Sequence, residues 1–224
     1  MLLNFAMRKE KKKMEKNNNK VIERFANTTK DAKSIESILS IQNNINIYGN
    51  SKVIAISSPT DKSLYSVLMS KTISEVYSIE CEKVLLIDCD FYNAYLFDII
   101  NKNLNNDRIS INSFILENKE ITNCICNFKD NMDVVFCEKE IYPTKIFASK
   151  SFGQFIQDNL KRYTHIIINM PSLAAHQDVL LIKDVITAIA LVVKKDFTKK
   201  CDLFNSINLI KDYNLPYVGT IYLK

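Results

Sequence analysis

The stretch Val53–Asp90, VIAISSPTDKSLYSVLMSKTISEVYSIECEKVLLIDCD, decides the fold. It opens with an apolar run rich in β-branched residues and passes through a short polar turn into a segment of helical length. It closes with a second apolar run that ends in two aspartates. A strand, a crossover helix and a second strand make up a βαβ unit. Both apolar runs are continuous rather than alternating, which predicts that helices cover both faces of the sheet.

The same pattern continues along the rest of the chain. Segments with helical spacing separate further apolar runs at 132–136, 165–170, 188–194 and 217–222. Residues 34–45, ahead of the first run, also have helical spacing. The sequence therefore predicts one α/β domain over residues 34–224, with a mostly parallel, doubly wound sheet and helices on both faces. A chain of 224 residues needs no second core.

Basic residues are concentrated at the start of the chain. The first 30 residues contain nine basic and three acidic side chains, a net charge of +6, so the other 194 sum to −1 within the total of +5. A domain so close to neutral argues against a nucleic-acid partner. We expect residues 1–33 to form a mobile basic arm, either a solvated tail or a peripheral contact with anionic lipid or an acidic partner.

The six cysteines are expected to be reduced thiols in a cytoplasmic protein, because no signal sequence precedes them. Cys124 and Cys126 lack further ligands at metal-binding spacing, which favours ordinary packing over zinc. Neither His165 nor His176 has a serine or cysteine at a spacing that indicates catalysis. No stretch reaches the ~20 apolar residues that cross a bilayer.

Polar residues follow three of the predicted strands. Ser58–Ser63 follow the first run, Asp88 and Asp90 end the second, and Asn169 lies near the end of the run at 165–170. In an open α/β sheet the ligand site lies at the carboxyl ends of the strands, so we expect these groups to converge there. The segment Ser58–Ser63 is also compatible with a plain strand-to-helix turn in which Thr60 or Asp61 caps the helix.

Val53–Asp90, together with Pro143–Leu173 (PTKIFASKSFGQFIQDNLKRYTHIIINMPSL), resembles the bacterial tyrosine kinase (BY-kinase) family of capsular and exopolysaccharide biosynthesis. The order and spacing of the segments over 34–224 carry the resemblance. It implies a P-loop NTPase fold of the MinD/ParA subclass. It also implies ATP and Mg²⁺ as cofactors, with roles that follow the family's motifs: Lys62 and Ser63 in the phosphate loop, Ser63 and Asp88 on the metal, Asp88 and Asp90 as catalytic carboxylates, and position 169 in the third motif.

The chain departs from the family's pattern at these positions. A phosphate loop needs glycines so that successive N–H groups can surround a phosphate. Here no glycine precedes Lys62, the loop is about three residues short, and Asp61 adds negative charge. Asn169 replaces an aspartate, and Tyr92 stands where an arginine is common. We therefore expect no bound cofactor, with ATP and Mg²⁺ only if the site is functional, and Lys62 either pairing with Asp88 or helping to form a metal site.

The leading hypothesis is a degenerate tyrosine-kinase-like regulatory or scaffolding protein of capsular or exopolysaccharide biosynthesis that does not hydrolyse ATP. The alternative is an active protein-tyrosine kinase or ATPase that uses Lys62, Ser63, Asp88 and Asp90. A relative of the partition and division-site ATPases is a further alternative. The resemblance implies a partner, either a membrane-anchored chain-length determinant acting as adaptor or an active kinase paralogue, which would hold the chain at the inner face of the membrane.

Overall fold

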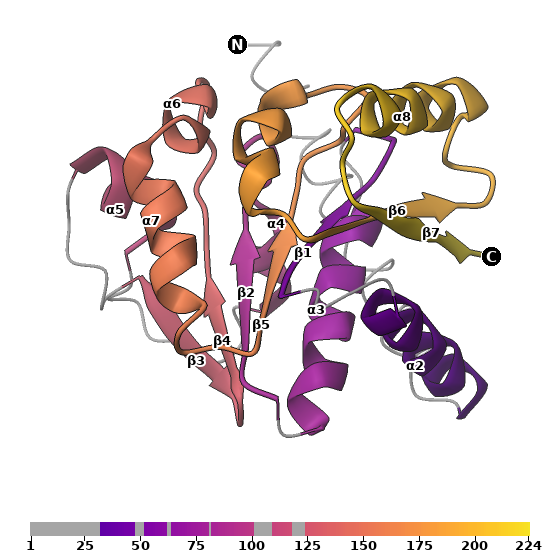
Figure 1. The fold of residues 1–224 in the computed structure, drawn as a ribbon, viewed down its shortest axis with the longest axis horizontal. Coiled ribbons are helices and arrows are strands. Elements are labelled where there is room, and N and C mark those ends of the chain that lie inside the picture. The colour runs from indigo at the N-terminus through magenta and orange to yellow at the C-terminus, as the bar shows by residue number, and fades with distance from the viewer. Residues whose placement is uncertain (1–31, 48–51, 62–63, 81, 101–108, 118–123) are drawn as a thin grey trace, which may run out of the picture.

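The computed structural model describes residues 32–47, 52–61, 64–80, 82–100, 109–117 and 124–224 (Figure 1). Lys62, Ser63 and nearly all of the predicted arm lie outside these residues. Three expectations therefore remain predictions: the mobility of the arm, its boundary at residue 34, and the roles of Lys62 and Ser63.

The helices and strands follow the predicted order, with α2 slightly longer than the predicted 34–45. They are α2 (Ala32–Ile47), β1 (Val53–Ser57), α3 (Leu64–Ile79), β2 (Val84–Asp88), α4 (Tyr95–Ile100), α5 (Ile111–Glu117), β3 (Ile125–Lys129), β4 (Met132–Val135), α6 (Thr144–Phe147), α7 (Lys150–Asn159), β5 (His165–Asn169), the 3₁₀ helix η3 (Gln177–Val185), β6 (Ala188–Lys194), α8 (Lys200–Asp212) and β7 (Tyr217–Leu223).

The described strands form one seven-stranded sheet in the order β3-β4-β2-β5-β1-β6-β7. Every neighbouring pair is parallel except β3–β4, which is antiparallel. The predicted mostly parallel sheet is confirmed. The sequence does not predict strand β3, because Asn127 and Lys129 interrupt its apolar residues and leave no continuous apolar run. Its side chains are partly buried or exposed, as suits an edge strand.

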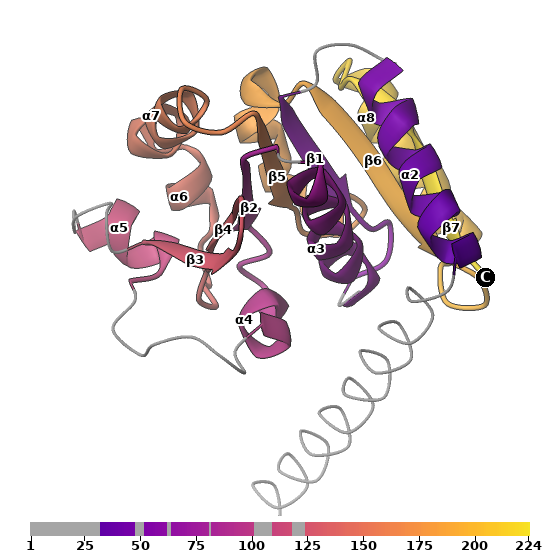
Figure 2. The ribbon, with the colours of Figure 1, turned by 90° about the horizontal axis from the view of Figure 1, so that it is seen from below.

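Helices cover both faces of the sheet, as the continuous apolar runs predict (Figure 2). Alternate residues of each central strand pack into different hydrophobic clusters: Val53 and Ala55 of β1 join the cluster of α5, α6, α7 and α8, whereas Ile54 and Ile56 join that of α2, α3 and α4. Because side chains alternate along a strand, the sheet is buried between two helical layers. This rigid centre fixes where the strand ends lie.

Helix α3 follows the first loop at Leu64 and packs closely beside the sheet. Ser66, Ser70 and Ser74 are buried at four-residue intervals, and the hydroxyls of Ser70 and Ser74 donate to the carbonyl oxygens of the residues four positions earlier. Small side chains with satisfied hydroxyls let the helix approach the strands. Among the described helices, none is long and apolar enough to cross a membrane.

Candidate functional site

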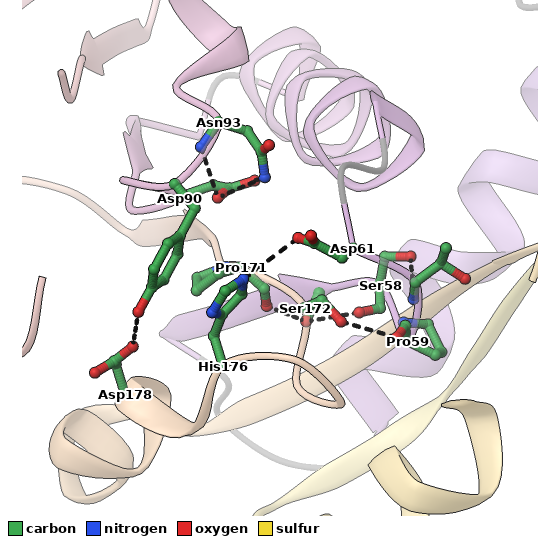
Figure 3. Close-up of polar contacts among 12 residues, drawn as sticks. Ser58, Pro59, Asp61, Asp90, Asn93, Pro171, Ser172, His176 and Asp178 are labelled. Atoms are coloured by element: carbon green, nitrogen blue, oxygen red, sulfur yellow. Dashed lines mark hydrogen bonds and ion pairs between the residues drawn. The ribbon is translucent and has the colours of Figure 1, made fainter. Parts of the chain in front are cut away.

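The carboxyl ends of β1, β2 and β5 meet at one edge of the sheet. Asn169 at the end of β5 is in register with Asp88 of β2 on one side and with Ile56 of β1 on the other. Two serine hydroxyls join the adjacent loops: Ser57 Oγ donates to the Pro171 carbonyl oxygen at 2.6 Å, and Ser172 Oγ donates to the Pro59 carbonyl oxygen at 2.8 Å (Figure 3). The predicted convergence of Asp88 with Asn169 is thus present. The third predicted member, Lys62, lies outside the described residues.

Asp88 is almost fully buried, with 1% of its surface exposed. Its Oδ1 accepts hydrogen bonds from Asn169 Nδ2 at 2.8 Å and from the Asp90 backbone N–H at 3.1 Å, and its Oδ2 accepts from the Leu96 backbone N–H at 3.2 Å. Burial raises the pKa of Asp88, and these donors partly oppose that shift. Neutral groups of the chain itself therefore solvate this carboxylate.

Asp90 is held by the turn that follows β2. Asn93 Nδ2 contacts both carboxylate oxygens of Asp90, at 3.1 and 2.9 Å, and the Asn93 backbone N–H donates to Oδ1 at 3.3 Å. Ala94 closes the turn with a φ of 52°, a left-handed conformation that costs energy for a residue with a Cβ. Burial and the nearby Asp88 charge raise the pKa of Asp90 to about 6. The two aspartates are thus a buried carboxyl pair with internal donors.

Asn169 orients its amide toward Asp88. The amide must present its NH₂ group to a carboxylate, which can only accept. This leaves Asn169 Oδ1 as a buried acceptor without a hydrogen-bond partner in the described part of the chain. An aspartate at this position would offer Asp88 no donor while ionised and would place a second negative charge against it. The side chain at position 169 therefore decides whether Asp88 faces a neutral donor or a second negative charge.

His176, from the loop after β5, contacts the loops that follow β1 and β2 at this edge. Its Nε2 lies 3.3 Å from Asp61 Oδ1, and its ring stacks on Tyr92 with centroids 3.5 Å apart. The Tyr92 hydroxyl donates to Asp178 Oδ2 at 2.5 Å, and Thr144 donates to the other oxygen of Asp178 at 2.7 Å. Figure 3 shows His176 extending from its loop toward Asp61. We call these five residues the histidine clasp.

The sequence does not predict the clasp, because its members come from loops far apart in the chain.

The turn after β1 differs from the expectation that Thr60 or Asp61 caps the helix. Thr60 Oγ1 is buried without a hydrogen-bond partner among the described residues, so Thr60 does not cap α3. The Thr60 backbone N–H instead stabilises the turn by donating to Ser58 Oγ at 3.2 Å. Asp61, the other candidate cap, directs one carboxylate oxygen at His176.

Two buried thiols flank Asp88. Cys89 follows it directly, and Cys137, from the segment after β4, forms a side-chain hydrogen bond with it. Burial, followed by the nearby Asp88 charge, raises the pKa of both thiols well above the usual value. The thiolate form is therefore disfavoured at both positions, and both side chains pack in the core. The same holds for Cys124, which is fully buried in the core as expected.

Comparison with known protein families gives no matching family model, and comparison with curated proteins gives no match. Solved structures do match. The chimerical protein CapA2B2 has a TM-score of 0.77 at 20% identity over 87% of this chain and 85% of that one. The kinase domain of the Escherichia coli tyrosine kinase ETK has a TM-score of 0.76 at 15% identity, over 85% of this chain and 75% of that one.

The septum site-determining protein MinD from Pyrococcus horikoshii, complexed with Mg-ADP, matches less well. Its TM-score is 0.62 at 15% identity, over 76% of this chain and 69% of that one. At such identities the likeness shows the fold alone. The chain therefore has the fold shared by bacterial tyrosine kinase domains and the division-site ATPases, and it overlays the ETK kinase domain more fully than this MinD structure.

Proposed function

We propose that this chain is a degenerate tyrosine-kinase-like protein of capsular or exopolysaccharide biosynthesis that regulates or scaffolds and does not hydrolyse ATP. The observation that carries the proposal is the 2.8 Å contact between Asn169 Nδ2 and Asp88 Oδ1. A neutral amide supplies the carboxylate with the compensation that a divalent cation would otherwise provide.

The charges around Asp88 support the same proposal. Each of the four oxygens of Asp88 and Asp90 accepts at least one hydrogen bond from the chain. Asp61 contributes to the raised pKa of Asp90, so a third negative charge lies near the pair. No cluster of three or more His, Cys, Asp or Glu side chains in the described part of the chain is arranged to hold a metal ion. These residues therefore fit Mg²⁺ and a nucleotide phosphate poorly.

A domain that folds without binding a nucleotide can still bind a protein partner through its surface. We infer that the partner is a membrane-anchored chain-length determinant or an active kinase paralogue, which would hold the chain at the inner face of the membrane. The likeness to the ETK kinase domain supports this inference at the level of the fold. Asp88 and Asp90 would be catalytic, and Ser63 and Asp88 metal ligands, only if the site were active.

Radiolabelled ATP tests the chemistry directly. We expect no label on the protein itself or on a poly-tyrosine substrate, in the presence of Mg²⁺ and at long incubation times. Affinity purification in mild detergent and low salt tests the partner, and we expect an envelope-polysaccharide component in the eluate. Label transfer that disappears in an Asp88→Asn variant would establish the active-kinase alternative instead. Recovery of partition or division proteins alone would contradict the assignment to polysaccharide biosynthesis.

A further inference from the structure

The segment that links β6 to α8 presents lysines and exposed aromatic rings together. We call Lys195, Phe197, Lys199, Lys200 and Phe204 the lysine–phenylalanine surface. Its three lysines are exposed, and Phe197 and Phe204 expose 44% and 64% of their surface. Figure 1 shows α8 at the outer surface of the molecule, above β6 and β7. Exposed apolar patches rimmed by polar residues mark protein or membrane contact sites.

Two contacts at Tyr65 hold the start of this segment in place. Phe197 packs edge-on against Tyr65 of α3, with ring centroids 5.6 Å apart, and Lys194 Nζ lies 5.9 Å from the centroid of the Tyr65 ring. Lys200 and Phe204 are four residues apart on α8 and therefore share one helix face. The opposite face of α8 buries Ser206 and Ile210. The linking loop is thus anchored, while Phe204 points away from the core.

Two other exposed apolar residues each have an acidic residue next to them in the chain. Ile79 is 79% exposed but is followed by Glu80, and Ile141 is 81% exposed but is preceded by Glu140. Residues 194–204 contain two acidic residues, Asp196 and Asp202, and four basic ones, Lys194 and the three exposed lysines. Residues 194–204 therefore carry a net charge of +2, whereas residues 31–224 as a whole carry −1. This surface is locally basic on an otherwise near-neutral domain.

We propose that the lysine–phenylalanine surface docks directly on an anionic lipid bilayer. Lysines are attracted to acidic headgroups, and neighbouring aromatic side chains insert at the boundary between headgroups and acyl chains. A flat membrane meets only one face of the protein, and salt screens the remaining charges beyond about 10 Å. A long nucleic acid would also contact the rest of the domain, which is near neutral and would not attract it. The inference is independent of the proposed function, since it uses none of the residues assigned to the candidate site.

Cys201 provides a local probe, because it is exposed and lies between Lys200 and Phe204 in the chain. The full chain with Cys81→Ser and Cys126→Ser would carry an environment-sensitive nitrobenzoxadiazole group on Cys201. Vesicles of phosphatidylglycerol and phosphatidylcholine should shift its emission to shorter wavelength, and pure phosphatidylcholine should not. The same dye on a Gln157→Cys, Cys201→Ser variant, on the exposed side of α7, should not respond.

Variants give the size of the effect. Each lysine near an anionic membrane changes partitioning about fivefold, so Lys195→Gln, Lys199→Gln and Lys200→Gln together should weaken vesicle binding about a hundredfold. Phe204→Ser should weaken it about tenfold. The matched controls Lys139→Gln with Lys150→Gln, and Ile141→Ser, should leave it within about twofold. The N-terminal arm is identical in all of these proteins, so differences between them report on the substituted residues.

Three results would overturn the proposal. One is vesicle binding without any emission change at Cys201, which would place the membrane contact elsewhere, for example on the arm. Another is an equal response to neutral vesicles. The third is a response to single-stranded oligonucleotide but not to anionic vesicles, which would make nucleic acid the partner. None of these results would bear on whether the chain binds ATP, so the two proposals fail separately.

Discussion

Replacing Asn169 by aspartate should destabilise the protein strongly at neutral pH. The substitution removes the donor that lies 2.8 Å from Asp88 Oδ1 and places a second carboxylate there, at a site where both residues are 1% exposed. Losing a hydrogen bond to a charged group costs about 1.5–3 kcal/mol, and an uncompensated buried charge brings the total to about 3–5 kcal/mol. For a domain of this size the melting temperature should fall by about 6–20 °C.

The loss should shrink in acid. The new carboxyl would have a folded-state pKa above its unfolded value, because it faces Asp88. Its destabilising effect is then absent below the unfolded pKa and appears as pH rises through the folded pKa. Thermal unfolding at about pH 5 and about pH 8 measures this difference.

Asn112→Asp is the matched control for this substitution. Asn112 Nδ2 donates to the Glu138 carbonyl oxygen at 3.1 Å, so the control loses the same kind of donor without facing a carboxylate at that contact. Its loss should depend less on pH. An Asn169→Asp protein that melts like the wild type and gains stability from Mg²⁺ with ATP would refute the reasoning.

Three further outcomes follow from the structure. The folded-state pKa of Asp90 is about 6, which is above its unfolded value. The free energy of unfolding should therefore fall by about 3 kcal/mol as pH rises from about 4 to 6. A denaturant titration of Asp90→Asn should show no such fall. Among the cysteines that the structure describes, Cys201 should react first with a thiol reagent, whereas buried Cys89 should react only on unfolding, as mass spectrometry of the labelled peptides would show. His176→Ala should lower stability by about 1–2 kcal/mol by removing the stack on Tyr92 and the contact with Asp61; an unchanged melting temperature would mean that the clasp contributes nothing.

The fold could be predicted from the sequence because its central strands are buried on both faces. Val53–Ser57, Val84–Asp88 and His165–Asn169 each form a continuous apolar run, and such runs have few alternatives in a chain with helical segments between them. The edge strand β3 could not be predicted, for the opposite reason. Asn127 and Lys129 interrupt its apolar residues, and its side chains are partly buried or exposed, so no continuous apolar run distinguishes it from a loop.

The candidate site could be predicted only in part. The meeting of Asp88 with Asn169 follows from the rule that parallel strands end at one edge. The donors to these groups could not be predicted, because the Asn93 contact depends on a turn with a left-handed Ala94. Nothing in the sequence around His176 indicates its stack on Tyr92, which arises where two loops meet in space.

Isothermal titration of the purified full chain with ATP and Mg²⁺ tests the central claim most directly. A phosphate loop without glycine lacks several charge-assisted hydrogen bonds, each worth about 1.5–3 kcal/mol. Since about 1.4 kcal/mol changes affinity tenfold, binding should be weaker than about 1 mM or undetectable. Micromolar binding that is lost in both Lys62→Ala and Asp88→Asn would contradict the account, because the site would then be a working nucleotide site.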